Sequence, residues 1–261
     1  ADALDVGNEA HVEHAVRLVD HQHVDAVEEE LAALEMIEQA GRVAQVMKIP
    51  LVADADTLGE TVADAYHFTR RYIQQGVAGI HIEDEVNPKH SKFVNGLCSI
   101  DDMQARIDAA VRARRDTGGD LVIIARCDEM YATENGGGGK SDPVEAVRRA
   151  NAYGEAGADA IVFASCPPAA QPPLIAQVKY PVCTLGFNLP NTAFTLSTGW
   201  GWVGAAQFHL AKARELMETG TVTMDFNFPE KHELIGQPFY DSLIEEWATK
   251  TGRPTRPNSA R

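Results

Sequence analysis

Short apolar stretches alternate with helical stretches through the middle of this chain. The apolar stretches are continuous, which is typical of strands that are buried on both faces. The intervening stretches repeat apolar residues with helical spacing; two of them stop at Gly76 and Gly157, and Ser99 is a plausible N-cap of another. We expect strands within 49–56, 77–84, 120–129, 158–165 and 180–188, and helices within 24–48, 60–76, 99–116 and 141–157.

This order of elements is typical of a parallel sheet that is covered by helices. A doubly wound sheet and a TIM barrel both fit it. The barrel is favoured because no glycine-rich phosphate turn follows the first visible strand. We therefore expect an α/β fold, a TIM-type (β/α)8 barrel, as a single domain over residues 1–261. The first barrel strands, and a strand–helix unit after about residue 188, are not clearly visible in the sequence.

The composition of the chain argues against some classes of binding partner. The formal net charge of -15 and the pI of about 5.0 argue against nucleic acid, which binds to a basic face. No apolar run approaches the roughly 18 residues that a membrane span needs, and no signal peptide is visible. The four cysteines are scattered, without a CxxC pair, and indicate reduced thiols in a cytoplasmic protein.

Polar residues follow several strands at the point where each strand ends. In a barrel these side chains would meet in one mouth, which is where barrel enzymes carry their chemistry. Clustered carboxylates without histidine or cysteine at ligand spacing suit an oxygen-binding cation such as Mg²⁺ or Mn²⁺. The residues at the strand ends are Asp54, Asp56, Glu83, Asp84, Glu85, Arg126 and Asp128.

Arg126 has two readings in this setting. Its planar guanidinium could clamp a substrate carboxylate or phosphonate. Alternatively, the acids pair with Arg126 and nearby lysines as a structural network. The spacing of the residues leaves both readings open.

Three segments together resemble one known family. The segments "ADADT", "GIHIEDEVNPK" and "IIARCDE" are similar to motifs of the isocitrate lyase / phosphoenolpyruvate mutase superfamily. The resemblance implies a TIM-like barrel that is usually tetrameric, with a C-terminal helix often swapped between subunits. It also implies a Mg²⁺ site and a small-molecule carboxylic acid substrate, namely a 2-oxo or 2-hydroxy acid with a second carboxylate or a phosphonate.

The resemblance also assigns roles to individual residues. Asp54, Asp56 and Glu83 match the acids of the metal site. Lys89 matches the lysine of a gating loop, and Arg126 matches the substrate-binding arginine. Asp54 and Asn188 are further expected substrate contacts. The implied chemistry is bond cleavage that leaves the enolate of a 2-oxo acid, stabilised by the cation.

Several positions depart from the family pattern. Ser91 stands where carbon–carbon lyases carry the cysteine that protonates the enolate, and a serine hydroxyl is a much poorer acid. His90 is an alternative proton donor, or an exposed loop residue. Leu58 replaces the glycine expected after "DADT". Ala164 stands where phosphorus–carbon mutases tend to carry histidine.

Three functions follow from these observations. The first is a Mg²⁺-dependent carbon–carbon lyase that acts on a 2-hydroxy or 2-oxo dicarboxylic acid. The second is a phosphorus–carbon enzyme of the phosphonopyruvate mutase or hydrolase type. The third is a barrel that keeps the metal site without catalysis. We rank an active enzyme above the third, because the metal acids, Lys89 and Arg126 are all present. Between the first two the sequence decides little, and we take the lyase as the first hypothesis.

The C-terminal stretch 239–252 predicts assembly. Its apolar residues fall on one side of an amphipathic helix, which is typical of a helix that packs on a neighbour. Together with the resemblance, this predicts a homotetramer. The residues on this side are Phe239, Leu243, Ile244 and Trp247.

Overall fold

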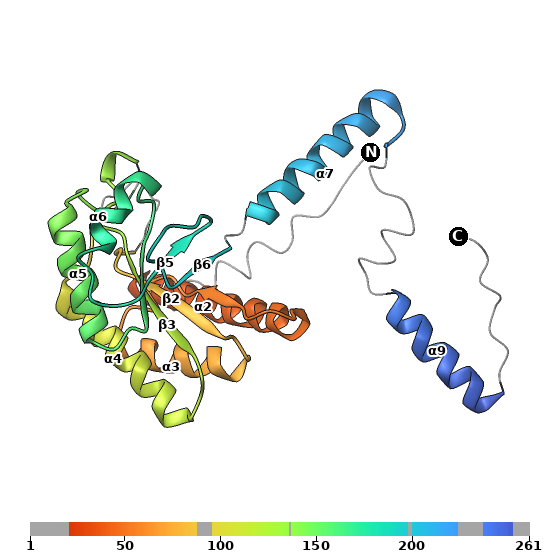
Figure 1. The fold of residues 1–261 in the computed structure, drawn as a ribbon, viewed down its shortest axis with the longest axis horizontal. Coiled ribbons are helices and arrows are strands. Elements are labelled where there is room, and N and C mark those ends of the chain that lie inside the picture. Colours follow the sequence, from red (N-terminus) through yellow and green to blue (C-terminus); the bar gives the residue numbers. More distant parts are fainter. Residues whose placement is uncertain (1–20, 88–95, 136, 198–199, 224–236, 253–261) are drawn as a thin grey trace. The chain divides into compact units, whose positions relative to one another are not determined.

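All five expected strands are present in a computed structural model of the chain, and they form one parallel sheet with a sixth (Figure 1). The structure describes residues 21–87, 96–135, 137–197, 200–223 and 237–252. The strands are β1 (Val52–Asp54), β2 (Gly79–Glu83), β3 (Val122–Cys127), β4 (Ala160–Phe163), β5 (Val182–Leu185) and β6 (Phe194–Leu196).

The strand order in the sheet is the order in the sequence, β1-β2-β3-β4-β5-β6. A doubly wound sheet reverses its order at a switch point, so this topology excludes that alternative. An α/β fold with a curled parallel sheet is confirmed. The full eight-stranded closure stays a prediction.

The helices between the strands begin and end largely where the sequence indicates. Helix α2 (His21–Val46) precedes β1, and α3 (Val62–Gln74), α4 (Ile100–Thr117) and α5 (Pro143–Glu155) follow β1, β2 and β3 in turn. The short helix α6 (Gln171–Ile175) lies between β4 and β5, and the 3-10 turns are η1 (Thr133–Asn135) and η2 (Pro168–Ala170).

Side chains cap the starts of three of these helices. Ser99 accepts a hydrogen bond from the backbone N–H of Asp102, which confirms the expected cap of α4. Thr61 and Asp64 form a reciprocal capping box at α3, and the side chain of Asp142 caps α5. Each cap satisfies backbone donors that a helix start leaves open.

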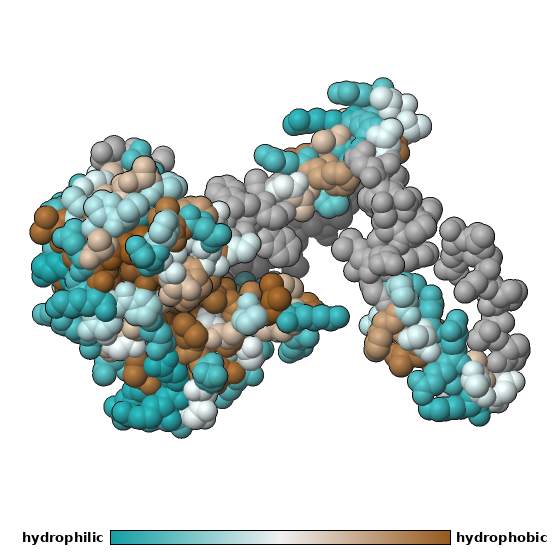
Figure 2. Space-filling view, in the orientation of Figure 1, coloured by the Kyte–Doolittle hydropathy of each residue, from teal (hydrophilic) through white to brown (hydrophobic). Residues whose placement is uncertain are grey.

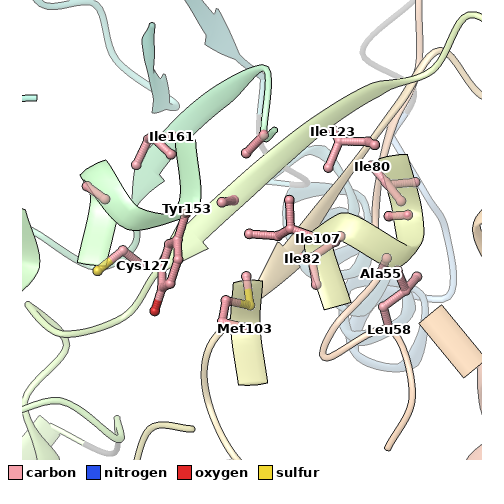
Figure 3. Packing of buried hydrophobic residues seen from close by; sticks show 14 of the residues in the cluster. Ala55, Leu58, Ile80, Ile82, Met103, Ile107, Ile123, Cys127, Tyr153 and Ile161 are labelled. Atoms are coloured by element: carbon pink, nitrogen blue, oxygen red, sulfur yellow. The ribbon is translucent and has the colours of Figure 1, made fainter. Parts of the chain in front are cut away.

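The two faces of the sheet carry different clusters. Alternate residues of β2 and β3, such as Ile82 and Ile123, join the main core under α3, α4 and α5 (Figure 3). The residues between them face the other side of the sheet, where Ile124 belongs to a smaller cluster with β4 and β5. This alternation decides which polar residues at the strand ends can meet.

A buried ion pair ties α5 to the ends of β2 and β3. Arg149 lies 3.2 Å from a carboxylate oxygen of Asp84, and Tyr153 donates a 2.5 Å hydrogen bond to the same oxygen. The other oxygen of Asp84 accepts from the backbone N–H of Asp128 at 2.9 Å. Burial raises the pKa of Asp84, although the hydrogen bonds from Tyr153 and Asp128 and the charge of Arg149 oppose that shift.

The connection between β5 and β6 contains no helix. Parallel strands usually need a crossover of about a dozen residues or more, whereas residues 186–193 alone join these two strands. The hydroxyl groups of Thr184 and Thr195 lie 2.9 Å apart across the pair. This connection lies at the start of the region, after about residue 188, where a strand–helix unit of the expected barrel is not clearly visible in the sequence.

The four cysteines are free and buried, as expected for reduced thiols. Burial raises the pKa of Cys166 to about 11 and that of Cys183 to about 12, so both thiols stay protonated at neutral pH. Such thiols are unreactive and serve as small apolar side chains.

The described chain divides into two units, residues 1–198 and 199–261. The second contains α7 (Trp200–Thr219) and α9 (Gln237–Thr251), and α9 confirms the expected C-terminal helix. The single-domain organisation stays a prediction. Among the described helices, none is both long and apolar enough to cross a bilayer.

The Asp84–Arg149 pair predicts a large loss of stability on mutation. We expect Arg149→Met to lower the free energy of unfolding by about 3–5 kcal/mol, because it leaves the Asp84 carboxylate buried without its cation. Urea denaturation followed by circular dichroism measures this. The matched control is Arg148→Met, which removes the exposed neighbour of Arg149 and should change the free energy by less than about 0.5 kcal/mol. Equal losses in the two variants would contradict the assignment.

Candidate metal and substrate site

Strand register brings three of the candidate residues, together with His81, to one edge of the sheet. Asp54 of β1 lies opposite His81 of β2, and Glu83 of β2 lies opposite Arg126 of β3. Their neighbours Ala53, Ile82 and Cys127 belong to the main core on the helix side. The four side chains therefore share the other face, at the carboxyl ends of the first three strands.

Asp54, Asp56 and Glu83 form a group that could hold a metal ion. One carboxylate oxygen from each residue lies within 4.8 Å of the other two. Oxygens that lie this close together could share one cation, either directly or through water. The all-oxygen donor set fits Mg²⁺ or Mn²⁺.

Burial differs across this group. Glu83 is completely buried, Asp56 is half-buried and Asp54 is exposed. One buried ligand and two more exposed ligands suit an ion that is bound at the carboxyl ends of the strands and can also contact a substrate. His81 lies beside the group, with its Nδ1 atom 3.4 Å from Asp54 Oδ1.

Arg126 lies next to these acids. Its Nη1 atom is 2.8 Å from Glu83 Oε2 and 4.0 Å from Asp54 Oδ2. Its Nε and Nη2 atoms donate to the same oxygen of Asp128, at 3.2 and 2.8 Å. Burial works to lower the pKa of Arg126, but Asp128, Glu83 and Asp54 outweigh burial and raise it, so the guanidinium stays charged. Both readings of Arg126, structural pairing and substrate clamp, are compatible with this position.

Acids gather around Arg126 in the described part of the site. Its guanidinium lies near Glu83 and Asp54 of the metal group and pairs with Asp128. Asp128 is completely buried, and burial raises its pKa to about 8 against the opposing charge of Arg126. A bound divalent cation would lower the repulsion within such a group of acids.

The turn after β1 holds Asp56 in place with an uncommon backbone. Asp56 and Leu58 have φ values of 48° and 58°, in the left-handed region. A non-glycine residue there costs about 1–2 kcal/mol. Leu58 is only 2% exposed, and burying a leucine contributes about 1.5–3 kcal/mol. The leucine that replaces the expected glycine therefore offsets the cost of its left-handed backbone by packing into the core.

Two polar side chains hold this turn from outside β1. Asn87 donates to Thr57 Oγ1 at 3.2 Å, and Arg106 donates to the Thr57 carbonyl at 3.1 Å. The backbone N–H of Glu83 bonds to the Asp56 carbonyl at 2.9 Å. The relative positions of Asp56 and Glu83 are thereby fixed through the backbone.

The remaining candidates lie elsewhere. Asp84 points to the helix side, away from the metal group, because it follows Glu83 by one residue. Asn188 is exposed after β5 and accepts a hydrogen bond from Thr195 of β6. Lys89, His90 and Ser91 lie outside the described residues.

Sequence reasoning did not assign roles to three residues of the site. His81 and Asn87 stand inside the quoted "GIHIEDEVNPK" segment, and Asp128 stands at the end of β3. The period of two along a strand places His81 on the face of Glu83, and Asp128 on the face of Arg126. That signal was available for both residues.

The fold and the site define a class, namely parallel α/β proteins with an acid group and an arginine at the carboxyl ends of their strands. The family model described as phosphoenolpyruvate phosphomutase matches residues 23–200. A 2-methylisocitrate lyase of Aeropyrum pernix is 31% identical over 234 residues, which cover 80% of this chain and 70% of that protein. The chain belongs to the phosphoenolpyruvate mutase / isocitrate lyase superfamily.

Other relatives match over shorter stretches. An isocitrate lyase of Haloferax volcanii is 33% identical over 60% of this chain and 45% of its own length. A phosphonopyruvate hydrolase of a Variovorax species is 37% identical over 49% of this chain and 43% of its own length. The chain thus spans less than half the length of these two relatives.

Solved structures show the same fold. A 2,3-dimethylmalate lyase superimposes with a TM-score of 0.67 at 22% identity, covering 83% of this chain and 78% of that one. A phosphonopyruvate hydrolase in complex with oxalate and Mg²⁺ gives a TM-score of 0.65 at 24% identity, over 79% and 76%.

The acid group predicts a measurable metal affinity. We expect Asp56→Asn to weaken Mn²⁺ binding by at least about tenfold, because one charged oxygen ligand is lost. Asparagine tolerates the left-handed backbone of this position, so the unfolding midpoint should change little. Electron paramagnetic resonance titration of Mn²⁺ measures the affinity.

The control for this experiment is Asp108→Asn, which removes the same charge from an exposed position on α4. It should leave Mn²⁺ binding unchanged. Equal Mn²⁺ affinity in the wild type and Asp56→Asn would remove Asp56 from the metal group.

Proposed function

We propose that this protein is a Mg²⁺-dependent lyase that cleaves a carbon–carbon bond of a 2-hydroxy or 2-oxo dicarboxylic acid. The observation that carries the proposal is the placement of Asp54, Glu83 and Arg126 on one face at the strand ends. Relatives named 2-methylisocitrate lyase and 2,3-dimethylmalate lyase support this class of substrate.

Each residue has a distinct part in the proposal. Asp54, Asp56 and Glu83 hold the cation, which when bound neutralises negative charge that develops on an oxygen of the 2-oxo acid product. Arg126 binds a carboxylate of the substrate beside the metal group and sets its orientation. Asp54, the exposed member of the metal group, and Asn188, exposed after β5, complete the proposed substrate contacts.

The remaining role in the proposed chemistry is that of the proton donor. We propose that Lys89 helps to bind the substrate. We also propose that His90 or Ser91 is the proton donor, in place of the cysteine thiol that carbon–carbon lyases use. If Ser91 has replaced the thiol of a lyase, Ser91→Cys should raise the rate of cleavage without changing substrate binding, since a thiol is the better acid.

A second candidate is a phosphorus–carbon enzyme. The absence of a cysteine at position 91 favours it, and the phosphonopyruvate hydrolase among the relatives supports it. Ala164, which is buried after β4, counts against the mutase branch because that branch tends to carry histidine there. In this case Ser91→Cys should be neutral or harmful.

A substrate screen tests both candidates. We expect 2-methylisocitrate, 2,3-dimethylmalate, isocitrate or a close analogue to release a 2-oxo acid, and the release to stop after chelation and return with Mg²⁺ or Mn²⁺. Phosphonopyruvate is assayed in parallel for phosphate release. Wild type, Ser91→Cys, Ser91→Ala and Lys89→Ala are compared on the best substrate.

The outcomes separate the candidates. Full activity after exhaustive chelation contradicts a metal-dependent mechanism. Phosphate release from phosphonopyruvate alone replaces the first candidate by the second. No turnover of any acid, with Mn²⁺ still bound, favours a barrel without catalysis.

We also propose that the protein is a homotetramer in which α9 packs on a neighbouring subunit. Its apolar side chains gather on one side of the helix (Figure 2). They are between 47% and 63% exposed, far more than a packed helix face would leave. The residues concerned are Phe239, Leu243, Ile244 and Trp247.

Assembly is tested by light scattering at micromolar concentration. We expect the mass of a tetramer for the wild type and a smaller mass for Leu243→Arg, because a charge on the apolar face is costly to bury. Glu245→Arg places the same side chain two residues away and should keep the tetramer. A monomer mass for the wild type would contradict the proposal.

A further inference from the structure

The guanidinium of Arg126 contacts acidic residues along two different edges. Its Nε and Nη2 atoms lie along one edge, and both donate to Oδ1 of Asp128. Its Nη1 atom lies at the other end, near Glu83 and Asp54. A planar fork that is held along one edge can rotate little, so Asp128 determines where the Nη1 end points.

Asp128 is itself held firmly. Its backbone N–H donates to Asp84 at 2.9 Å, and its carbonyl accepts from the backbone N–H of Tyr131 at 2.8 Å. Asp84 in turn is fixed by Arg149 and Tyr153 of α5. A chain of contacts therefore runs from α5 through two buried aspartates to the arginine of the site.

The side chain of Asp128 is completely buried, and it lies outside the group of acids that could hold a metal ion. A buried carboxyl group next to other acids is unfavourable unless a specific cation compensates it. Its side-chain hydrogen bonds within the described chain go to Arg126 through Oδ1, and Oδ2 has none. The group is thus committed to the arginine.

We propose that Asp128 is a positioning residue, which holds the Nε edge of Arg126 so that the Nη1 end faces the metal acids and a carboxylate of the substrate. The substrate part of this inference rests on the proposed function. Asp128 acts through Arg126 and contributes no ligand of its own.

Two kinds of measurement test the inference, binding and structure. The binding probe is oxalate, a small dicarboxylate, titrated calorimetrically into the full chain loaded with Mg²⁺. We expect Asp128→Ala to weaken oxalate binding on the order of 10- to 100-fold, as the loss of a hydrogen-bond partner of the charged Arg126 would. Mn²⁺ binding alone should change little. Asp128→Asn, whose amide oxygen still accepts from Arg126, should recover part of the affinity and guards against misfolding of the alanine variant.

A double-mutant cycle separates positioning from a general structural effect. If Asp128 acts through Arg126, the variant with both Asp128→Asn and Arg126→Lys should bind oxalate no more weakly than Arg126→Lys alone. A structural role would give additive losses and would lower Mn²⁺ affinity as well. Asp159→Asn is the matched control, since Asp159 also pairs with an arginine, Arg114, but precedes β4 at the opposite end of the sheet.

Crystal structures of wild type, Asp128→Ala and Asp128→Asn decide the geometry independently of any ligand. We expect the guanidinium of Arg126 to leave its wild-type position in the alanine variant and to stay close to it in the asparagine variant. An unmoved guanidinium in Asp128→Ala, or additive losses in the cycle, would overturn the inference. If the wild type does not bind oxalate while the guanidinium moves as expected, the proposed substrate class fails and the positioning role stands.

Discussion

The positive charge of Arg126 is the interaction on which the carboxyl edge of this sheet depends. Glu83 and Asp128 are both completely buried, and each lies within 2.8 Å of a different nitrogen of the same guanidinium. Two buried acids on adjacent strands would repel each other without a cation between them. The arginine thus permits β2 and β3 to end side by side, and a divalent ion would extend the same compensation to Asp54 and Asp56.

The alternation of side chains sorts the acids into two layers with different purposes. Glu83 faces the metal group, whereas Asp84, one residue later, faces the helices and binds Arg149. A single peptide unit therefore connects the site to the helix layer. On the helix side, Asp84 fixes the backbone of the strand ends. On the other side, Glu83 and the rest of the metal group present their side chains to a ligand.

Much of the fold and of the metal group could be predicted from the sequence, and the reasons differ between residues. Asp54, Glu83 and Arg126 follow continuous apolar strands, and parallel strands bring such ends together. The division between Glu83 and Asp84 required attention to the period of two. Strand β6 was not predicted, because it is only three residues long and contains no apolar run that distinguishes it from a loop. Leu58 takes a left-handed backbone at a position where the family pattern carries glycine, and burial of its side chain offsets the backbone cost. Sequence alone does not reveal that burial.

The helix-free link between β5 and β6 has a consequence for the order of folding. The entropy lost on closing a loop rises with the logarithm of its length, by about 0.6 kcal/mol for each doubling. A helix and its flanking loops lie between β2 and β3, and likewise between β3 and β4. Only residues 186–193 lie between β5 and β6. This makes the β5–β6 pair the most local contact in the parallel sheet. It is therefore the place where pairing of strands can begin before the helices have docked.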